Sequence, residues 1–123
     1  MIIGVGLDVV ELDRIKRALE RFGTRFSERI LSPEELAQVP SNPVPFLSSR
    51  FAAKEAASKA LGTGFTGGVT FHSLKISSLP SGEPVLTFKD GALERSRALG
   101  VNNIFLSITH GRDVAAAVVI LER

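Results

Sequence analysis

The middle of the chain reads Phe46-Leu47-Ser48-Ser49-Arg50-Phe51-Ala52-Ala53-Lys54-Glu55-Ala56-Ala57-Ser58-Lys59-Ala60-Leu61. This stretch is rich in alanine and contains no Gly or Pro, so it predicts an α-helix. Small side chains allow close packing against neighbouring elements. The alanines therefore indicate a helix at the centre of the fold rather than at its periphery: Ala52, Ala53, Ala56, Ala57 and Ala60.

One acidic side chain on this helix is surrounded by basic ones. At helical spacing, one side carries Phe51, Glu55, Ser58 and Lys59, and the adjacent side carries Arg50, Lys54 and Leu61. Glu55 is thus flanked by three bases. The pattern is compatible with an ordinary i,i+4 pair between Glu55 and Lys59 on a solvated helix face, and also with a phosphate site.

A second isolated acid, Asp8, interrupts the apolar, β-branched opening run Ile2–Val10, which predicts a buried strand. Side chains alternate along a strand, so Gly4 and Gly6 lie on the same face as Asp8, and we expect them to leave open space beside its carboxylate. An isolated buried carboxylate is costly unless it is paired or bound to a cation. Asp8 is interpreted either as a strand-end Asp bonded to backbone amides or an arginine, or, together with Glu55, as part of a magnesium and phosphate site.

These residues carry a family resemblance. The chain resembles the holo-acyl carrier protein synthases, the small bacterial 4'-phosphopantetheinyl transferases, and the match spans nearly its whole length. The motifs that carry the resemblance are Gly6-Leu7-Asp8 followed by Glu11 and Arg14, Arg50-Phe51-Ala52-Ala53-Lys54-Glu55-Ala56 with Lys59, Gly62-Thr63-Gly64, Leu106-Ser107-Ile108-Thr109-His110, and Ala115-Ala116-Ala117-Val118-Val119-Ile120.

The resemblance implies a compact α+β fold in which a mixed or antiparallel sheet packs on the central helix. It also implies a homotrimer with active sites at the subunit interfaces. At 123 residues and 44% hydrophobic content, the chain is long enough for one core and too short for two, so residues 1–123 are predicted to form a single domain.

The activity implied is transfer of 4'-phosphopantetheine from coenzyme A to a serine of apo-acyl carrier protein, which releases adenosine 3',5'-bisphosphate and supports fatty acid biosynthesis. We expect Asp8 and Glu55 to hold Mg²⁺ and Lys59 to contact the diphosphate, and these three are the predicted catalytic residues. Arg50, Lys54 and His110 are candidates for the remaining phosphates, although His110 is equally compatible with a strand-end structural role. The base is left open between Glu55 and a metal-bound water that it orients.

The first predicted helix, from about Asp13 to Gly23, has one apolar and one basic side. Its apolar residues, expected in the core, are Ile15, Ala18, Leu19 and Phe22. The outer side carries Arg14, Lys16, Arg17 and Arg21, and Arg25 follows after the turn. Such a stripe is often simply solvated. In the family that the chain resembles, however, this helix meets the strongly acidic carrier protein, so Arg14, Arg17, Arg21 and Arg25 are the predicted docking residues.

The remaining segments predict shorter elements. Ser32-Pro33-Glu34-Glu35 is typical of a helix start with Ser32 as N-cap, and Pro40, Pro43 and Pro45 predict an extended connection to the central helix. Gly62–Gly68 predicts a helix cap, with a phosphate role as the alternative. Strands are expected near 73–79 and 85–89, a helix near 91–99, and a final hairpin that turns at 111–113. Gly82-Glu83-Pro84 departs from the Gly-Lys-Pro usual in the family, so no cation is expected at position 83.

Composition limits the function classes. With no cysteine the chain has no disulfide or thiolate site, and with two histidines it has no multi-histidine metal site, so hard oxygen ligands and Mg²⁺ are favoured. No apolar run is long enough to cross a membrane and no secretory signal is recognisable, so a cytoplasmic protein is expected. A net charge of +2 does not by itself indicate nucleic-acid binding. The alternatives that we weigh are a basic nucleic-acid module and a non-catalytic relative that only binds acyl carrier protein.

Overall fold

The computed structural model describes residues 1–123, all of the chain. In chain order its elements are β1 (Ile2–Glu11), α1 (Leu12–Phe22), α2 (Thr24–Ile30), α3 (Pro33–Leu36), α4 (Pro43–Ala60), the short 3₁₀ helix η1 (Phe71–Ser73), β2 (Leu74–Ser78), β3 (Pro84–Phe88), α5 (Asp90–Leu99), β4 (Asn103–His110) and β5 (Val114–Glu122). None of the helices has the length and apolar character needed to span a membrane.

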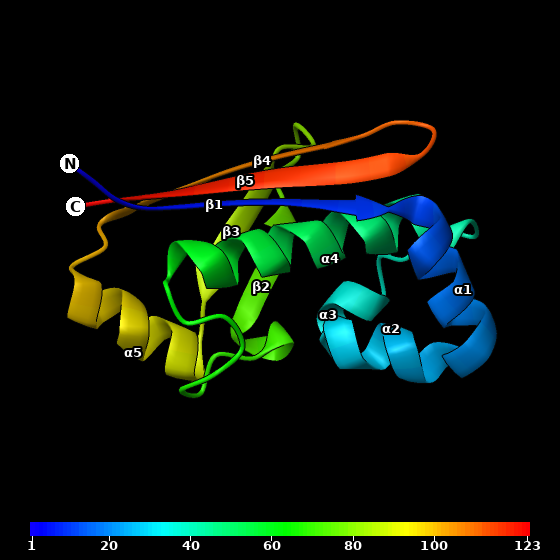
Figure 1. Ribbon diagram of the computed structural model, residues 1–123, viewed down its shortest axis with the longest axis horizontal. Helices are drawn as coiled ribbons and strands as arrows, with labels where there is room; N and C mark the ends of the chain where they lie inside the picture. Colours follow the sequence, from blue (N-terminus) through cyan, green and yellow to red (C-terminus); the bar gives the residue numbers. More distant parts are fainter.

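The strands form two antiparallel sheets. The larger has the order β1-β5-β4, and the smaller is the hairpin β2-β3. Helix α4 runs along β1 and β5, and the β2-β3 hairpin crosses on its other side (Figure 1). The predicted α+β fold with antiparallel strands is confirmed, and so is the central position of α4, whose five alanines named above are all buried.

Helix α4 begins at Pro43, three residues before the predicted start. Asn42 is extended, and Pro43 occupies the first helical position. A proline there gives up no helical hydrogen bond, since the first-turn amides have no partner within the helix. Pro43 and Pro45 therefore belong to the helix, and the prediction that they lie in an extended connection was wrong.

The glycines of β1 do not leave open space. A Cβ atom added to Gly4 would overlap the carbonyl oxygen of Ala60, and one added to Gly6 would overlap that of Ala56. The absence of side chains thus brings the β1 backbone directly against α4, and the space expected beside Asp8 is filled by the helix.

The prediction that β1 is buried holds for only one of its faces. Val5, Leu7 and Val9 point away from α4 and are 58%, 60% and 59% exposed. Strand β1 is an edge of the sheet, and no element covers its outer face. The structure therefore leaves an apolar row exposed along β1.

The first helix differs in detail from the prediction. It begins at Leu12 and its N-cap position is Glu11, which makes no side-chain cap, so Asp13 lies in the first turn rather than at the cap. Phe22, expected in the core, is 49% exposed at the end of α1. The start of α3 is as predicted: the Glu35 amide donates to Ser32 Oγ at 3.4 Å, and the Ser32 amide donates to Glu35 Oε1 at 2.9 Å.

Candidate active site

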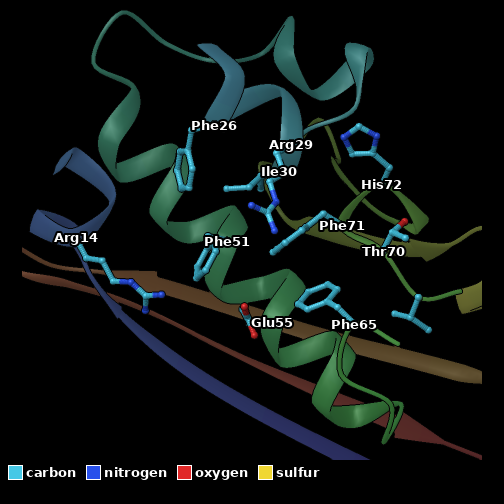
Figure 2. Close-up of a pocket in the computed structure, with 11 residues that line it drawn as sticks. Arg14, Phe26, Arg29, Ile30, Phe51, Glu55, Phe65, Thr70, Phe71 and His72 are labelled. Carbon is cyan, nitrogen blue, oxygen red and sulfur yellow. The ribbon is translucent and has the colours of Figure 1, made fainter. Parts of the chain in front are cut away.

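A cavity of about 720 Å³ lies between α1, α2, α4 and the segment that leads into η1. Four phenylalanines line it, Phe26, Phe51, Phe65 and Phe71, together with Arg14 and Glu55, and we call it the aromatic cavity. Figure 2 shows Phe51 and Glu55 projecting from α4, with Phe26 and Ile30 facing them from α2. The ring of Phe71 stacks on Phe65 at 4.2 Å and on Phe51 at 5.7 Å between ring centres. One carboxylate therefore lies at the edge of a largely apolar wall.

The Glu55 carboxyl has a raised pKa. Burial is the main cause, the nearby Asp8 carboxylate adds to it, and Lys59 and Arg14 oppose it. Asp8 reaches Glu55 because it lies on the face of β1 that packs against α4. A carboxylate on one element thus acts electrostatically on a carboxylate of another, an arrangement that favours a shared cation or proton.

Lys59 completes this group. Its Nζ lies 3.2 Å from Asp8 Oδ1 and 3.0 Å from the carbonyl oxygen of Leu7. The ion pair that Lys59 makes is therefore with Asp8 and not with Glu55, which lies one turn away on the same helix. The structure brings Asp8, Glu55 and Lys59 together, and their catalytic roles stay predictions.

Asp8 and Glu55 fit a hard cation such as Mg²⁺, because both supply carboxylate oxygens and their negative charges lie close together. The chain has no cluster of three His, Cys, Asp or Glu side chains able to hold a metal ion. A magnesium ion at this position would therefore draw its remaining oxygen ligands from water and from substrate phosphate, as is usual for that ion.

A second cavity, of about 370 Å³, lies on the opposite side of α4. We call it the arginine cavity; its lining includes Phe46, Ser49, Arg50, Ser78, Ile108 and His110. It shares no lining residue with the aromatic cavity. With 100° of rotation per residue along α4, the average direction of Phe46 and Arg50 is about 140° away from that of Phe51 and Glu55.

Arg50 is the main cation of the arginine cavity. It is 8% exposed, its guanidinium lies 4.5 Å from the Phe46 ring centre, and its Nη2 donates to Ser78 Oγ at 3.5 Å. Its Nε has no hydrogen-bond partner, and neither has the buried hydroxyl of Ser49 beside it. Burial lowers the pKa of Arg50, which the Glu35 carboxylate partly offsets. A cationic Arg50 that lines the cavity together with Ser49 and His110 suits an anionic ligand.

The structure places Lys54 in neither cavity. Its side chain is fully buried, and its Nζ donates to Ile30 O at 2.7 Å, Glu35 Oε1 at 2.8 Å and Phe71 O at 3.0 Å. An ammonium group has three donors, and all are in use. Lys54 has none left for a phosphate, so the expectation that it binds the cofactor is corrected. No local pattern indicates that Glu35, 19 residues earlier in the chain, is a buried partner of Lys54.

The predicted docking arginines lie along α1 and continue onto α2. Arg14 borders the aromatic cavity, with its guanidinium 5.7 Å from the Phe51 ring centre. Arg17, Arg21 and Arg25 are exposed, and Arg17 makes only a long 3.9 Å contact with Asp13. The helical spacing predicted that Phe51 lies beside Glu55, but Phe26, Arg29, Phe65 and Phe71 were missed because they come from separate segments with no common spacing.

Comparison with known proteins identifies the relatives of the chain. Residues 4–119 match the profile of the 4'-phosphopantetheinyl transferase superfamily. The holo-[acyl-carrier-protein] synthase of Maridesulfovibrio salexigens is 60% identical over 124 residues, covering 100% of both chains, and that of Solidesulfovibrio magneticus is 57% identical over 99% of both.

Solved structures agree with the sequence relatives. The Neisseria meningitidis holo-[acyl-carrier-protein] synthase has a TM-score of 0.93 at 38% identity, covering 100% of both chains. The Helicobacter pylori enzyme in complex with coenzyme A has a TM-score of 0.86 at 33% identity, covering 96% of this chain and 99% of that one. The resemblance inferred from the sequence motifs is confirmed.

Proposed function

Because the chain belongs to the holo-[acyl-carrier-protein] synthase family of 4'-phosphopantetheinyl transferases, we propose that it transfers the 4'-phosphopantetheine arm of coenzyme A to a serine of apo-acyl carrier protein, with Mg²⁺ as cofactor and adenosine 3',5'-bisphosphate as second product. Two relatives support the donor, since the Helicobacter pylori structure holds coenzyme A and the Bacillus anthracis structure is described as a complex with CoA (3',5'-ADP). The observation that carries the proposal is the convergence of Asp8, Glu55 and Lys59 beside the aromatic cavity. We propose that the reaction takes place in the cytoplasm and supplies holo-acyl carrier protein for fatty acid synthesis.

The transfer reaction requires the negative charge of the coenzyme A diphosphate to be offset by positive charge. The serine oxygen forms a bond to the phosphorus that bears the pantetheine arm, the bond from that phosphorus to the bridging oxygen breaks, and the bisphosphate leaves with the electron pair. A magnesium ion held by Asp8 and Glu55 would supply positive charge against the diphosphate oxygens. Lys59, half exposed beside Asp8, adds a second positive charge on the same side.

The serine proton needs an acceptor. Glu55 is the candidate, either directly or through a water that it orients, because it borders the cavity and its raised pKa makes its carboxylate a stronger base than an ordinary glutamate. Glu55 itself is half-buried, and apolar rings line the cavity beside it.

A complete site takes residues from two chains in this proposal. Arg50 and His110 lie on the opposite side of α4 from Asp8 and Glu55. The cations of the arginine cavity and the carboxylates of the same chain therefore do not face the same ligand. The exposed row of Val5, Leu7 and Val9 is an apolar surface suited to a neighbouring copy. We therefore propose a homotrimer in which the arginine cavity of one chain supplies phosphate contacts to the carboxylates of the next.

The carrier protein is proposed to dock on the arginines of α1 and α2. Arg17, Arg21 and Arg25 are exposed and free of strong ion pairs, so they present uncompensated positive charge to an acidic partner. Arg14 connects this surface to the aromatic cavity and thereby to Glu55. A carrier docked here would have its serine close to the carboxylates.

The decisive experiment measures the intact mass of apo-acyl carrier protein after incubation with this protein and coenzyme A, with and without Mg²⁺. We expect a metal-dependent gain of one phosphopantetheine. Asp8→Asn and Glu55→Gln should each lower the rate by about 10²-fold or more with the fold retained, because each removes a charge that acts on the transition state.

The matched control is Glu94→Gln, an isosteric change at an exposed position of α5, which should leave the rate unchanged. If the wild-type protein binds the carrier but leaves its mass unchanged, the chain is a non-catalytic carrier-binding relative.

A further inference from the structure

Lys54 precedes Glu55 in the chain but has a different environment. Its ammonium group is fully buried, and its three hydrogen bonds join α4 to three separate segments: the end of α2 at Ile30, helix α3 at Glu35, and η1 at Phe71. Lys54 therefore connects α4 to segments that are distant in sequence, and we call Lys54 with its three acceptors the junction.

Two of the three acceptors belong to the walls of the aromatic cavity. Ile30 and Phe71 both line that cavity, and Lys54 binds the backbone carbonyl of each. In Figure 2, Ile30 and Phe71 lie across the cavity from Glu55, which projects from α4. One side chain of α4 therefore hydrogen-bonds to the backbone of both walls, in addition to the ring contact between Phe51 and Phe71.

The third acceptor holds the junction in place. Glu35 Oε1 accepts from Lys54 Nζ and from the Ser32 amide at 2.9 Å, while Oε2 accepts from the Ile76 amide at 3.0 Å. Each oxygen of this buried carboxylate therefore has a donor. Lys54 and Glu35 form an ion pair from which water is excluded, tied to both α3 and β2.

Stability alone does not account for this pair. Taking two charges out of water is costly, and replacing a buried pair by apolar groups is often neutral or stabilising. Burial lowers the pKa of Lys54, and the hydrogen bond and charge of Glu35 oppose that shift. Unlike apolar packing, the pair imposes a specific geometry, because the three hydrogen bonds of Lys54 are directional and hold three segments in fixed positions.

We propose that Lys54 is a positioning residue that fixes the Ile30 and Phe71 walls of the aromatic cavity relative to Glu55, and so sets the geometry in which the carrier serine meets the donor. The inference rests on the proposed transferase activity. Lys54 is buried and lines neither cavity. Its effect is on the rate of the bound complex, since small displacements of reacting groups lower rates steeply.

The test variant is Glu35→Gln combined with Lys54→Met, which removes both charges together and leaves no unpaired ion. It is assayed below its melting temperature, where circular dichroism shows it folded. We expect kcat to fall by about tenfold or more, with the KM for carrier protein near that of the wild type, because the docking arginines are untouched. Hydrogen exchange should increase in the segments around residues 30 and 71.

Two controls separate positioning from stability. Glu34→Gln combined with Lys75→Met removes another α3 ion pair, one that contacts no cavity wall, and should leave kcat unchanged. Leu99→Ala lowers stability from α5, at the far end of the molecule from α2 and α3 (Figure 1), and should also leave kcat unchanged in the folded enzyme.

The outcomes are distinct. If wild-type protein transfers no phosphopantetheine, the proposed function fails; if it does and the folded Lys54 variant has wild-type kcat, the positioning role is refuted. Should the variant not fold, hydrogen exchange on wild-type protein decides. Walls held by Lys54 are protected before substrate binds, so strong new protection around residues 30 and 71 on adding coenzyme A would overturn the inference.

Discussion

The Lys59 ammonium lies 3.2 Å from Asp8 Oδ1, and the Asp8 side chain is 15% exposed whereas that of Lys59 is 52% exposed. The carboxylate is therefore held in the protein, while the cation reaches it from solvent on a flexible stem. Lys59 occupies a position next to Asp8 where a metal ion would also be attracted, so the two cations compete for the same charge.

Lys59→Met should strengthen metal binding while it weakens catalysis. An exposed ion pair contributes about 1 kcal/mol at most, so we expect the affinity of the free protein for Mn²⁺ to rise by up to about fivefold. Electron paramagnetic resonance of Mn²⁺ measures this without substrate. Lys75→Met, which removes the same charge far from Asp8, is the control, and weaker Mn²⁺ binding in the Lys59 variant would contradict the competition.

The raised pKa of Glu55 predicts a pH-dependent stability difference in metal-free protein. Its ordinary value is 4.5, and burial and Asp8 raise it in the folded state. The folded protein therefore binds this proton more tightly than the unfolded chain, and stability is lost as the pH rises through the window from 4.5 to the higher folded pKa.

The Glu55→Gln variant lacks this titrating carboxyl group. Its melting temperature should exceed that of the wild type above this window, and the difference should shrink below it. Thermal melts of both proteins across the acid range, in the presence of a chelator, check this. A difference that grows as the pH falls would show that the pKa of Glu55 is lowered instead.

Charge reversal on α1 should weaken carrier docking selectively. For Arg17→Glu combined with Arg21→Glu, we expect the KM for carrier protein to rise by on the order of tenfold at low salt, with a smaller effect at high salt. Coenzyme A affinity, measured by calorimetry, should not change. Lys89→Glu combined with Arg97→Glu makes the same charge change elsewhere, and a similar KM increase there would mean that docking depends on net charge rather than on α1.

Mixing two inactive variants tests the interfacial site. Glu55→Gln lacks a carboxylate and Arg50→Ala lacks the cation of the arginine cavity, so each alone should be nearly inactive. If the site joins one chain's Glu55 to a neighbour's Arg50, random mixing gives an intact pair at about a quarter of the interfaces, and activity returns to about that level.

No recovery after verified subunit exchange would place both residues in one chain's site. Val5→Asp combined with Leu7→Asp should abolish the oligomer, as measured by light scattering, and with it the recovery.

The sequence was informative where a residue's role depends on its neighbours in the chain. The alanines of α4, the capping box of Ser32 and Glu35, and the turn at Gly23 are local signals, and the structure has each of them. Asp8 was singled out as a carboxylate in an apolar strand and Glu55 as an acid flanked by three bases, and the structure places Asp8 within electrostatic reach of Glu55.

The errors arose where a role depends on tertiary contacts. Lys54 and Lys59 look alike in the sequence, five residues apart on one helix, but one is buried under α3 and the other is half exposed beside Asp8. Helical periodicity says which side of α4 each lysine occupies and nothing about which segment covers that side. The walls of the aromatic cavity were missed for the same reason.

The close approach of β1 and α4 has a geometric consequence for the site. Gly6 touches the carbonyl of Ala56, which follows Glu55, and lies two residues before Asp8 on the same face of the strand. The backbones of β1 and α4 are in direct contact here, with no side chain between them that could change rotamer. This contact determines the distance between the carboxylates of Asp8 and Glu55. A site that binds a small cation tolerates little variation in ligand spacing. In this protein the absence of side chains at Gly4 and Gly6 keeps β1 against α4 and so keeps the spacing of the two carboxylates constant.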